Sequence, residues 1–271
     1  MSIDVSAIKQ GQKAMWTAGD YPRVSERIAS VGAELAERAG AGPGVELLDV
    51  ATGAGNVALP AARAGGTVTG LDLTPKLLEA ARSRAAEAGL EIDFVEGDAE
   101  ELPFAADSFD AVTSCFGVMF APRQEVAAAA LVRVARPGAT IAVTAWTPEG
   151  YVGTSFRTSA GYMPPMPPEL KPPVMWGNEE HVRSLFAASG AEVSCERRTV
   201  TFSGESPEAW LATDEQILGP AVMARAALEP QGRYGELREA IDKLNRSFNE
   251  ADDGSFRVRS EYLLTIARLP G

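Results

Sequence analysis

The sequence predicts an α/β fold in which a mostly parallel β-sheet carries helices on both faces. Five short apolar runs alternate with helical segments between residues 45 and 146, and strands joined by helical crossovers form parallel sheets covered on both sides. In LLDVATGAGNVALPAA, residues 47–62, an apolar strand passes through a glycine turn into a helix. The 271 residues are 45% hydrophobic, which suffices for one substantial core plus a lid or small subdomain.

The first half of the chain supplies the elements of this sheet in order. The apolar residues of DYPRVSERIASVGAELAERAG recur at helical spacing: Val24, Ile28, Val31 and Leu35. This segment opens on Asp20 and ends at Gly40, so we expect one helix there. Strands are expected at residues 45–50, 66–73, 91–98, 109–116 and 139–146, and helices beginning near Gly55, Pro75 and Pro122.

The second half begins with a proline-rich segment, YMPPMPPELKPPVMWG, for which we expect a stiff extended flap rather than regular helix or central strand. A helix from Asn178, a strand at 191–202, helices across 207–249 and a last strand at 260–269 follow. We expect one domain, comprising an N-terminal helical cap (1–43), a core (44–147) and a remainder (148–271). That remainder contains the flap (148–177) and a helical lid insertion (204–254) before the last strand.

Composition excludes several classes of function. The formal net charge of −12 disfavours a nucleic-acid partner, since binding to phosphates depends on clustered Lys and Arg. Cys115 and Cys195 each lie in an apolar run and read as buried thiols of a cytoplasmic protein, with no disulfide and no metal site expected. No apolar stretch is long enough to span a bilayer, so no membrane partner is expected.

Acidic residues mark the ends of three successive predicted strands. GAGNVA from Gly53 fits the glycine fingerprint of dinucleotide-binding turns. Asp49 lies four residues before Gly53. Its carboxylate would repel a pyrophosphate and attract an ammonium or sulfonium group. This argues against a nicotinamide dehydrogenase. Asp72 and Asp98 end the next two strands. Because parallel strands end at one edge, we expect the three carboxylates to line a single ligand site.

These motifs resemble the class I S-adenosylmethionine-dependent methyltransferases, in particular the small-molecule group around the ubiquinone/menaquinone-biosynthesis C-methyltransferases. The resemblance covers residues 20–147, and the strands at 191–202 and 260–269 look like that family's antiparallel pair. It implies a Rossmann-like fold with a mostly parallel seven-stranded sheet, an antiparallel last strand and a helical lid insertion. It also implies S-adenosylmethionine as cofactor and S-adenosylhomocysteine as product.

The resemblance further implies a role for each matching residue. Asp49, Gly53 and Gly55 face the methionine part of the cofactor, and residues 114–117 border the same chain at the exit of the fourth strand. Asp72 holds the ribose hydroxyls, and Leu73 lies beside the adenine, whose edge Asp98 and Ala99 read. The family's usual first glycine is Ala51 here. The methyl group of Ala51 narrows the wall of the cofactor site at this turn. The cofactor-binding residues so implied are Asp49, Ala51, Gly53, Gly55, Asp72, Leu73, Asp98, Ala99, Ser114, Cys115 and Gly117.

The acceptor site is assigned to the parts that the cofactor motifs leave unexplained: the flap, the insertion and the N-terminal helix. Its expected side chains are Trp16, Tyr21, Phe116, Phe120, Met163 and Trp176. The catalytic residue is unknown, because SCFGVMFAP, the segment that usually delivers a base, is apolar. Tyr21 and His181, with Asp214 and Glu215, are candidates for proton handling, although a structural role is favoured for His181.

The expected activity is therefore methyl transfer to a small acceptor whose nucleophile is a phenol, an enolisable carbon or an amine. An aromatic, quinone-like or polyketide-type metabolite of secondary metabolism fits this description. Two alternatives remain: a protein that binds S-adenosylmethionine as a structural or regulatory ligand, and one that uses it for cyclisation without methyl transfer. The oligomeric state is open, with a homodimer as one option.

Overall fold

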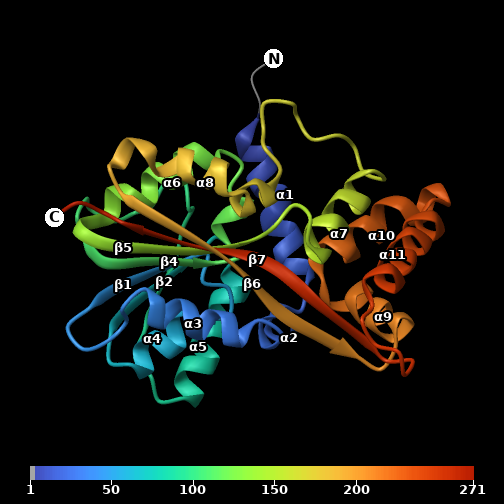
Figure 1. Cartoon of the computed structure of the whole chain (residues 1–271), viewed down its shortest axis with the longest axis horizontal. Coiled ribbons are helices and arrows are strands. Elements are labelled where there is room, and N and C mark those ends of the chain that lie inside the picture. Colours follow the sequence, from blue (N-terminus) through green and yellow to red (C-terminus); the bar gives the residue numbers. More distant parts are fainter. Residues whose placement is uncertain (1–3) are drawn as a thin grey trace.

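A seven-stranded sheet forms the centre of the structure, a computed structural model that describes residues 4–271 (Figure 1). Its strands are β1 (Glu46–Val50), β2 (Thr67–Asp72), β3 (Asp93–Glu96), β4 (Phe109–Cys115), β5 (Ala135–Trp146), β6 (Glu192–Gly204) and β7 (Phe256–Arg268). They lie in the order β3-β2-β1-β4-β5-β7-β6. β1 to β5 pair in parallel, and β7 runs antiparallel to both β5 and β6. The predicted fold class, with its antiparallel last strand, is confirmed.

Helices cover both faces of this sheet. They are α1 (Val5–Ala18), α2 (Tyr21–Glu26), α3 (Ala29–Arg38), α4 (Ala58–Arg63), α5 (Pro75–Glu87), α6 (Gln124–Val134), α7 (Tyr151–Ala160), α8 (Glu179–Phe186), α9 (Pro207–Ile217), α10 (Gly219–Leu228) and α11 (Tyr234–Phe248), with short 3₁₀ helices η1 (Val118–Phe120), η2 (Pro173–Gly177), η3 (Ala187–Ser189) and η4 (Glu229–Gln231). Figure 1 shows α3, α4 and α5 on one face, and α6 and α8 on the other. Because helices cover both faces, every residue of β1 after Glu46 is buried, on either side of the sheet.

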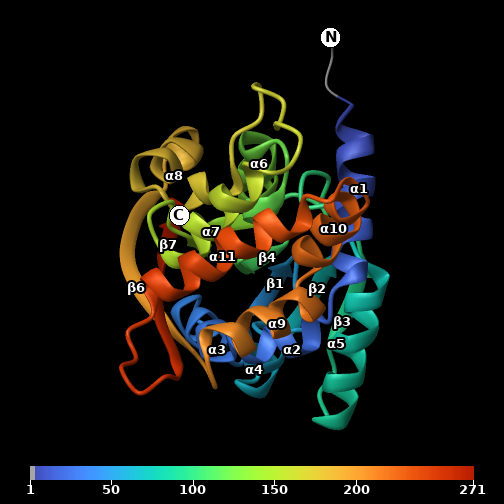
Figure 2. The ribbon, with the colours of Figure 1, turned by 90° about the vertical axis from the view of Figure 1, so that its right-hand side faces the viewer.

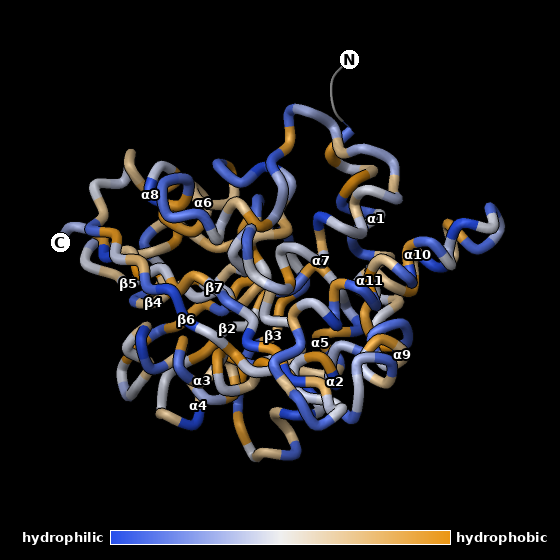
Figure 3. Tube along the Cα trace, turned by 45° about the vertical axis from the view of Figure 1, so that its right-hand side comes forward, coloured by the Kyte–Doolittle hydropathy of each residue, from blue (hydrophilic) through white to orange (hydrophobic). Residues whose placement is uncertain are grey.

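The remaining helices gather at one end of the molecule. α9, α10 and α11 form the helical insertion between β6 and β7, and α11 packs on α7 while α10 packs on α1. Figure 2, which looks onto this end, shows α7, α9, α10 and α11 in front of the strands. In Figure 3 hydrophobic segments concentrate on the central strands, and the tip between α10 and α11 is hydrophilic. The insertion therefore lies beside the sheet, and Trp210 of α9 and Leu244 of α11 join it to the main hydrophobic core.

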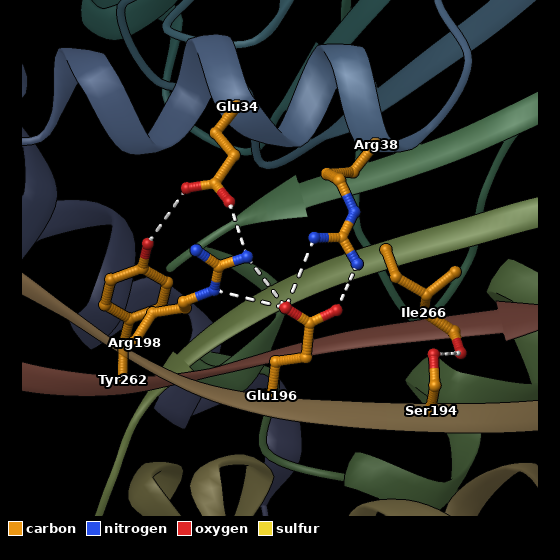
Figure 4. Close-up of polar contacts among 7 residues, drawn as sticks. All are labelled: Glu34, Arg38, Ser194, Glu196, Arg198, Tyr262 and Ile266. Carbon is orange, nitrogen blue, oxygen red and sulfur yellow. Dashed lines mark hydrogen bonds and ion pairs between the residues drawn. The ribbon is translucent and has the colours of Figure 1, made fainter.

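Charged side chains fasten α3 to the antiparallel strands (Figure 4). Arg38 binds the Glu196 carboxylate, and Arg198 pairs with both Glu196 and Glu34. The hydrogen bonds from Arg38 and Arg198 lower the pKa of Glu196 to about 2. The hydroxyl of Tyr262 on β7 donates to Glu34 at 3.5 Å. This cluster joins the first and last thirds of the chain.

The predicted helix over residues 20–40 is wrong in one respect, because the structure divides it into α2 and α3. Ile28 leaves helical geometry at φ −121°. The glycine loop after β1 lies against this break: Asn56 donates to the Ser25 carbonyl at 2.8 Å, and a Cβ on Gly32 would come 2.4 Å from the Asn56 carbonyl oxygen. Tertiary contact with the loop thus overrides the helical periodicity.

Two further boundaries differ from expectation. The helix expected near Gly55 begins at Ala58, because residues 51–57 form turns. The extended flap assigned to 148–177 contains the proline-free helix α7 and the 3₁₀ helix η2, so within it only residues 148–150 and 161–172 lack helix and strand. The predicted N-terminal cap (1–43) contains α1. Residues 1–3 lie outside the described part of the chain.

Candidate functional site

The carboxyl ends of β1, β2 and β3 bring the predicted acids to one edge of the sheet. Parallel pairing sets Asp49 opposite Gly70, two residues before Asp72, and Asp72 opposite Glu96, two residues before Asp98. All three acids therefore lie at, or just beyond, the carboxyl ends of parallel strands, on the same edge of the sheet. This is the edge at which open α/β sheets bind their ligands.

A glycine turn follows Asp49 and leaves room at the same edge. Gly53 and Gly55 both adopt left-handed backbone conformations, with φ of 57° and 84°. A Cβ on Gly55 would lie 2.3 Å from a Leu59 methyl group, so this glycine permits the turn to pack on α4. A Cβ on Gly53 would meet no atom within 4 Å. The backbone at Gly53 therefore borders open space, as a close-fitting ligand requires.

Asp49 is a buried carboxylate with two hydroxyl donors. It is 1% exposed, and the hydroxyls of Thr52 and Thr113 donate to it at 2.6 and 3.0 Å. Burial raises the pKa of Asp49 to about 7, because these hydrogen bonds only partly offset the desolvation of the charged form. A cationic ligand beside Asp49 would supply the missing counter-charge.

Asp72 is held by backbone donors. Its two carboxylate oxygens accept the N–H groups of Gly53 at 2.9 Å and Thr74 at 2.8 Å, and the residue is 6% exposed. Burial raises the pKa of Asp72. Each carboxylate oxygen can accept more than one hydrogen bond, so both retain acceptor capacity for the two hydroxyls of a ribose. The same bond from Gly53 couples the glycine turn to Asp72, the acid expected to hold the ribose.

Asp98 is paired with a lysine from the N-terminal helix. Lys9 Nζ lies 2.5 Å from Asp98 and 2.5 Å from Glu100, and it is partly shielded from solvent. Glu100 has a fully buried side chain that also accepts from the backbone and guanidinium of Arg123. Ala99 packs against the apolar core beside them. The residue expected to read the adenine edge is therefore covered by α1 in this structure.

The exit of β4 closes the site on its other side. Ser114 Oγ donates to the Val50 carbonyl at 2.7 Å and accepts the Val118 N–H at 2.8 Å. A Cβ on Gly117 would lie 2.5 Å from the Cβ of Ala51. Ala51, which stands where the family has glycine, therefore fits only because residue 117 is glycine. Burial raises the pKa of the neighbouring Cys115 thiol to about 12, so this thiol is not a nucleophile at neutral pH.

Three of the expected acceptor residues meet beyond this exit. The ring of Trp16 lies 5.3 Å from that of Tyr21 and 4.7 Å from that of Phe120, both edge-on. Phe156 on α7 extends the group, with its ring 5.9 Å from Phe120. All four side chains are half-buried. We call Trp16, Tyr21, Phe120 and Phe156 the aromatic wall. A fourth expected acceptor residue, Phe116, lies four residues before Phe120 on the chain.

The other two expected acceptor residues lie elsewhere. Met163 packs against a small cluster formed by α10 and α11, which includes Leu228 and Leu237. Trp176 is 1% exposed and meets the ring of Phe186 edge-on, 6.2 Å between centroids. Neither contacts the aromatic wall through an aromatic pair, and their assignment to the acceptor stays a prediction.

The candidate proton carriers are all engaged. His181 Nε2 lies 2.7 Å from Gln124 Oε1 between α8 and α6, and burial lowers the pKa of His181. Asp214 pairs with Arg27 at 2.6 Å, and Glu215 accepts from Tyr234 and Arg238. Burial raises the pKa of Tyr21 well above its ordinary value, so its hydroxyl is neutral at pH 7.

Sequence reasoning missed the side-chain partners of Asp49 and Asp98. Lys9 sits four residues before Lys13, which binds Glu96 at the end of β3, and this i, i+4 pair of lysines facing an acidic strand end was the available signal. The hydroxyls of Thr52 and Thr113 gave no signal, because only the register of β1 and β4 brings Thr113 to Asp49.

Comparison with known proteins agrees with this fold. Residues 48–143 match a family model described as a methyltransferase domain. An uncharacterised protein of Mycobacterium tuberculosis is 39% identical over 259 residues, which cover 94% of this chain and 93% of the relative. The ubiquinone/menaquinone biosynthesis C-methyltransferase UbiE of Rhodopseudomonas palustris is 44% identical over 97 residues, covering 34% and 38%. The YcgJ protein of Bacillus subtilis superposes with a TM-score of 0.62 at 18% identity, covering 89% and 99%.

The fold, the acidic strand ends and the glycine turn define an enzyme that binds an adenosyl cofactor at the carboxyl edge of a parallel sheet. This chain belongs to the class I S-adenosylmethionine-dependent methyltransferases. Its cofactor is S-adenosylmethionine. The residues fit this molecule, because Gly53 borders free space, Asp72 keeps acceptor capacity and the buried Asp49 lacks a counter-charge. No helix among residues 4–271 is long and apolar enough to cross a membrane.

Proposed function

We propose that this protein transfers the methyl group of S-adenosylmethionine to a small aromatic, quinone-like or polyketide-type acceptor. The nucleophile of that acceptor is a phenol oxygen, an enolisable carbon or an amine. We assign the methionine part of the cofactor to Asp49 and the 114–117 segment, the ribose to Asp72, and the adenine to Leu73, Asp98 and Ala99. We assign the acceptor to the aromatic wall. We assign to the helical insertion the role of a lid over the acceptor.

The observation that carries this proposal is the uncharged, aromatic character of the wall. Trp16, Tyr21 and Phe120 come from three different elements and converge just past the β4 exit. Pockets for planar apolar ligands are lined by such side chains. A phosphorylated or carboxylated acceptor would call for a basic side chain, and Lys9 and Lys13 of the same helix are both committed to acids.

The reaction needs little from the protein beyond alignment. The sulfonium supplies an electrophilic methyl group, and its displacement neutralises charge. Holding the acceptor in line and excluding water can supply up to about 7–11 kcal/mol of the barrier in favourable cases. Because His181, Asp214 and Glu215 are engaged elsewhere, an acceptor that reacts without a strong base fits this site best.

The named relatives support the cofactor half of the proposal more than the acceptor half. The match to the quinone-biosynthesis enzyme covers 34% of this chain, a length that cannot include the N-terminal helix, the β4 exit and the insertion together. The choice of a quinone-like or other aromatic acceptor therefore depends on the aromatic wall. A cytoplasmic location, a role in secondary metabolism and the oligomeric state stay predictions.

A labelled-methyl assay tests the proposal. The purified protein is incubated with S-adenosylmethionine carrying a radioactive methyl group, together with matched sets of phenols, enolisable diketones, quinols and amines. We expect label in at least one of these acceptors, and a loss of at least tenfold in Trp16→Ala without a matching loss of cofactor affinity. Tight cofactor binding with no label in any set would favour the binding-protein or cyclase alternatives.

A further inference from the structure

Phe116, which follows β4, occupies a backbone conformation that is costly for a bulky side chain. Its φ is 53°, in the left-handed region that non-glycine residues seldom enter. Its N–H donates to the backbone carbonyl of Thr144 at 3.1 Å and lies 3.2 Å from the Thr144 hydroxyl. Strained residues of this kind persist only where the surroundings hold them, and they cluster at functional sites.

Two aromatic side chains from the sheet hold the ring of Phe116. Trp146, at the end of β5, stacks on it with ring centroids 3.8 Å apart and planes 8° apart. Tyr262 on β7 approaches edge-on at 5.5 Å and 79°. Trp146 and Tyr262 face each other across the β5–β7 ladder. All three side chains are buried, at 7%, 7% and 3% exposed. We call Trp146 and Tyr262 the aromatic clamp.

The clamp is itself anchored to α3 through Tyr262. The Tyr262 hydroxyl points to Glu34 on α3, within the ionic cluster that joins α3 to β6 (Figure 4). Burial raises the pKa of Tyr262 to about 12, so the hydroxyl stays a donor at neutral pH. Trp146 also meets Tyr262 edge-on at 6.3 Å. The ring of Tyr262 thus has little freedom to move away from Phe116.

The conformation of Phe116 determines where Gly117 lies. A Cβ on Gly117 would be 2.5 Å from the Cβ of Ala51, which is the other non-glycine residue at this edge with a left-handed backbone, at φ 54°. If Phe116 relaxed to an extended conformation, the chain would leave β4 in another direction. The contact between Gly117 and Ala51, and the wall they form together, would then be lost.

We propose that Trp146 and Tyr262 are positioning residues for the cofactor. By packing on the ring of Phe116 they hold its backbone in the left-handed conformation, and this keeps the β4 exit in the shape that borders the methionine chain. The inference depends on the proposed function in one respect, the assignment of residues 114–117 to the methionine part of the cofactor. The clamp touches neither cofactor nor acceptor and acts through Phe116.

Calorimetric titration with S-adenosylhomocysteine tests the clamp, because product binding requires no acceptor. We expect Tyr262→Leu to raise the dissociation constant about tenfold or more, and Tyr262→Phe, which keeps the ring, to stay within about twofold of the wild type. Glycine adopts φ near 53° without support. In a Phe116→Gly background, adding Tyr262→Leu should therefore change the dissociation constant by less than about twofold.

The double variant separates positioning from loss of stability, since removing a second core ring can only destabilise the fold further. Trp146→Leu, made in both backgrounds, provides the same comparison if Tyr262→Leu folds poorly. Phe109→Leu is the control: Phe109 begins the same strand, packs edge-on against Phe104 and does not pair with Phe116. It should lower stability and leave the dissociation constant unchanged.

Equal weakening by Tyr262→Leu in both backgrounds, or equal weakening by Phe109→Leu, would overturn the inference. Unchanged affinity of Tyr262→Leu in the wild-type background would overturn it as well. If the wild-type protein itself fails to bind S-adenosylhomocysteine, the cofactor site is wrong, and this outcome differs from a failure of the clamp.

Discussion

Asp49→Asn is expected to stabilise the protein without its cofactor and to weaken cofactor binding. Asp49 is fully buried, its hydrogen-bond partners are the hydroxyls of Thr52 and Thr113, and burial raises its pKa to about 7. Above that pH the folded protein holds an unpaired carboxylate, which a neutral amide replaces at little steric cost. The same substitution removes the charge that attracts a sulfonium and an ammonium group, so we expect the affinity for S-adenosylmethionine to fall at least tenfold.

The magnitude follows from the displacement of the Asp49 pKa. Between its ordinary value of 3.8 and about 7, the folded state keeps a proton that the unfolded chain loses. The resulting stabilisation is fully present below pH 4 and is lost as the pH rises to 7, with an upper limit of about 4 kcal/mol. The Asp49→Asn variant does not titrate at this position, so its free energy of unfolding shows no such loss. The free energy of unfolding of the variant, relative to that of the wild type, therefore grows with pH up to 7 and is constant above pH 7.

Urea unfolding without cofactor at pH 5 and pH 8 measures this difference. From pH 5 to pH 8 we expect the free energy of unfolding of Asp49→Asn to gain about 3 kcal/mol relative to the wild type. Asp110→Asn is the control of opposite sign, because the Glu46 N–H and Arg136 lower the pKa of Asp110. It should be less stable than the wild type at pH 8. A pH-independent effect of Asp49→Asn, or a loss of stability that grows with pH, would refute the reasoning.

Three further predictions follow from single contacts. Asp72→Ala should weaken S-adenosylhomocysteine binding by tenfold or more in calorimetry, since hydrogen bonds to a charged group contribute about 1.5–3 kcal/mol; unchanged affinity would place the ribose elsewhere. Gly117→Ala should destabilise the fold by about 1–3 kcal/mol in urea unfolding, because of its 2.5 Å approach to Ala51, and Ala51→Gly should partly restore it; no loss would mean that the β4 exit adapts. Trp176→Ala should lower the free energy of unfolding by about 3–5 kcal/mol, because Trp176 is 1% exposed; a normal stability with impaired turnover would instead support its predicted acceptor role.

The sheet and the acidic edge could be predicted because their signals are local. Each strand is a short apolar run that ends in a turn, and Asp49, Asp72 and Asp98 close consecutive runs, so parallel pairing alone brings them to one edge. The antiparallel position of β7 required the family resemblance, whereas the helices of the insertion were predicted from the sequence pattern itself. Periodicity identifies such helices and strands but does not specify their order in the sheet.

The parts that could not be predicted depend on contacts between distant segments. Asn56 interrupts the helix over 20–40 through Ser25, and no residue within that helix signals the break. Met163 and Trp176 share a proline-rich segment, yet they pack in different places, because η2 inserts Trp176 into the core while Met163 follows α7 toward α10. Lys9 reaches Asp98 only once α1 lies across the ends of the strands.

A crystal structure with S-adenosylhomocysteine tests the cofactor site most directly. We expect the ribose hydroxyls on the Asp72 carboxylate, the methionine chain between the glycine turn and the β4 exit, and the adenine beside Leu73 and Asp98. Lys9, which now binds both Asp98 and Glu100, should then pair with Glu100 alone. A ligand bound away from this edge, or an adenine remote from Asp98 with the Lys9–Asp98 pair intact, would contradict the assignment.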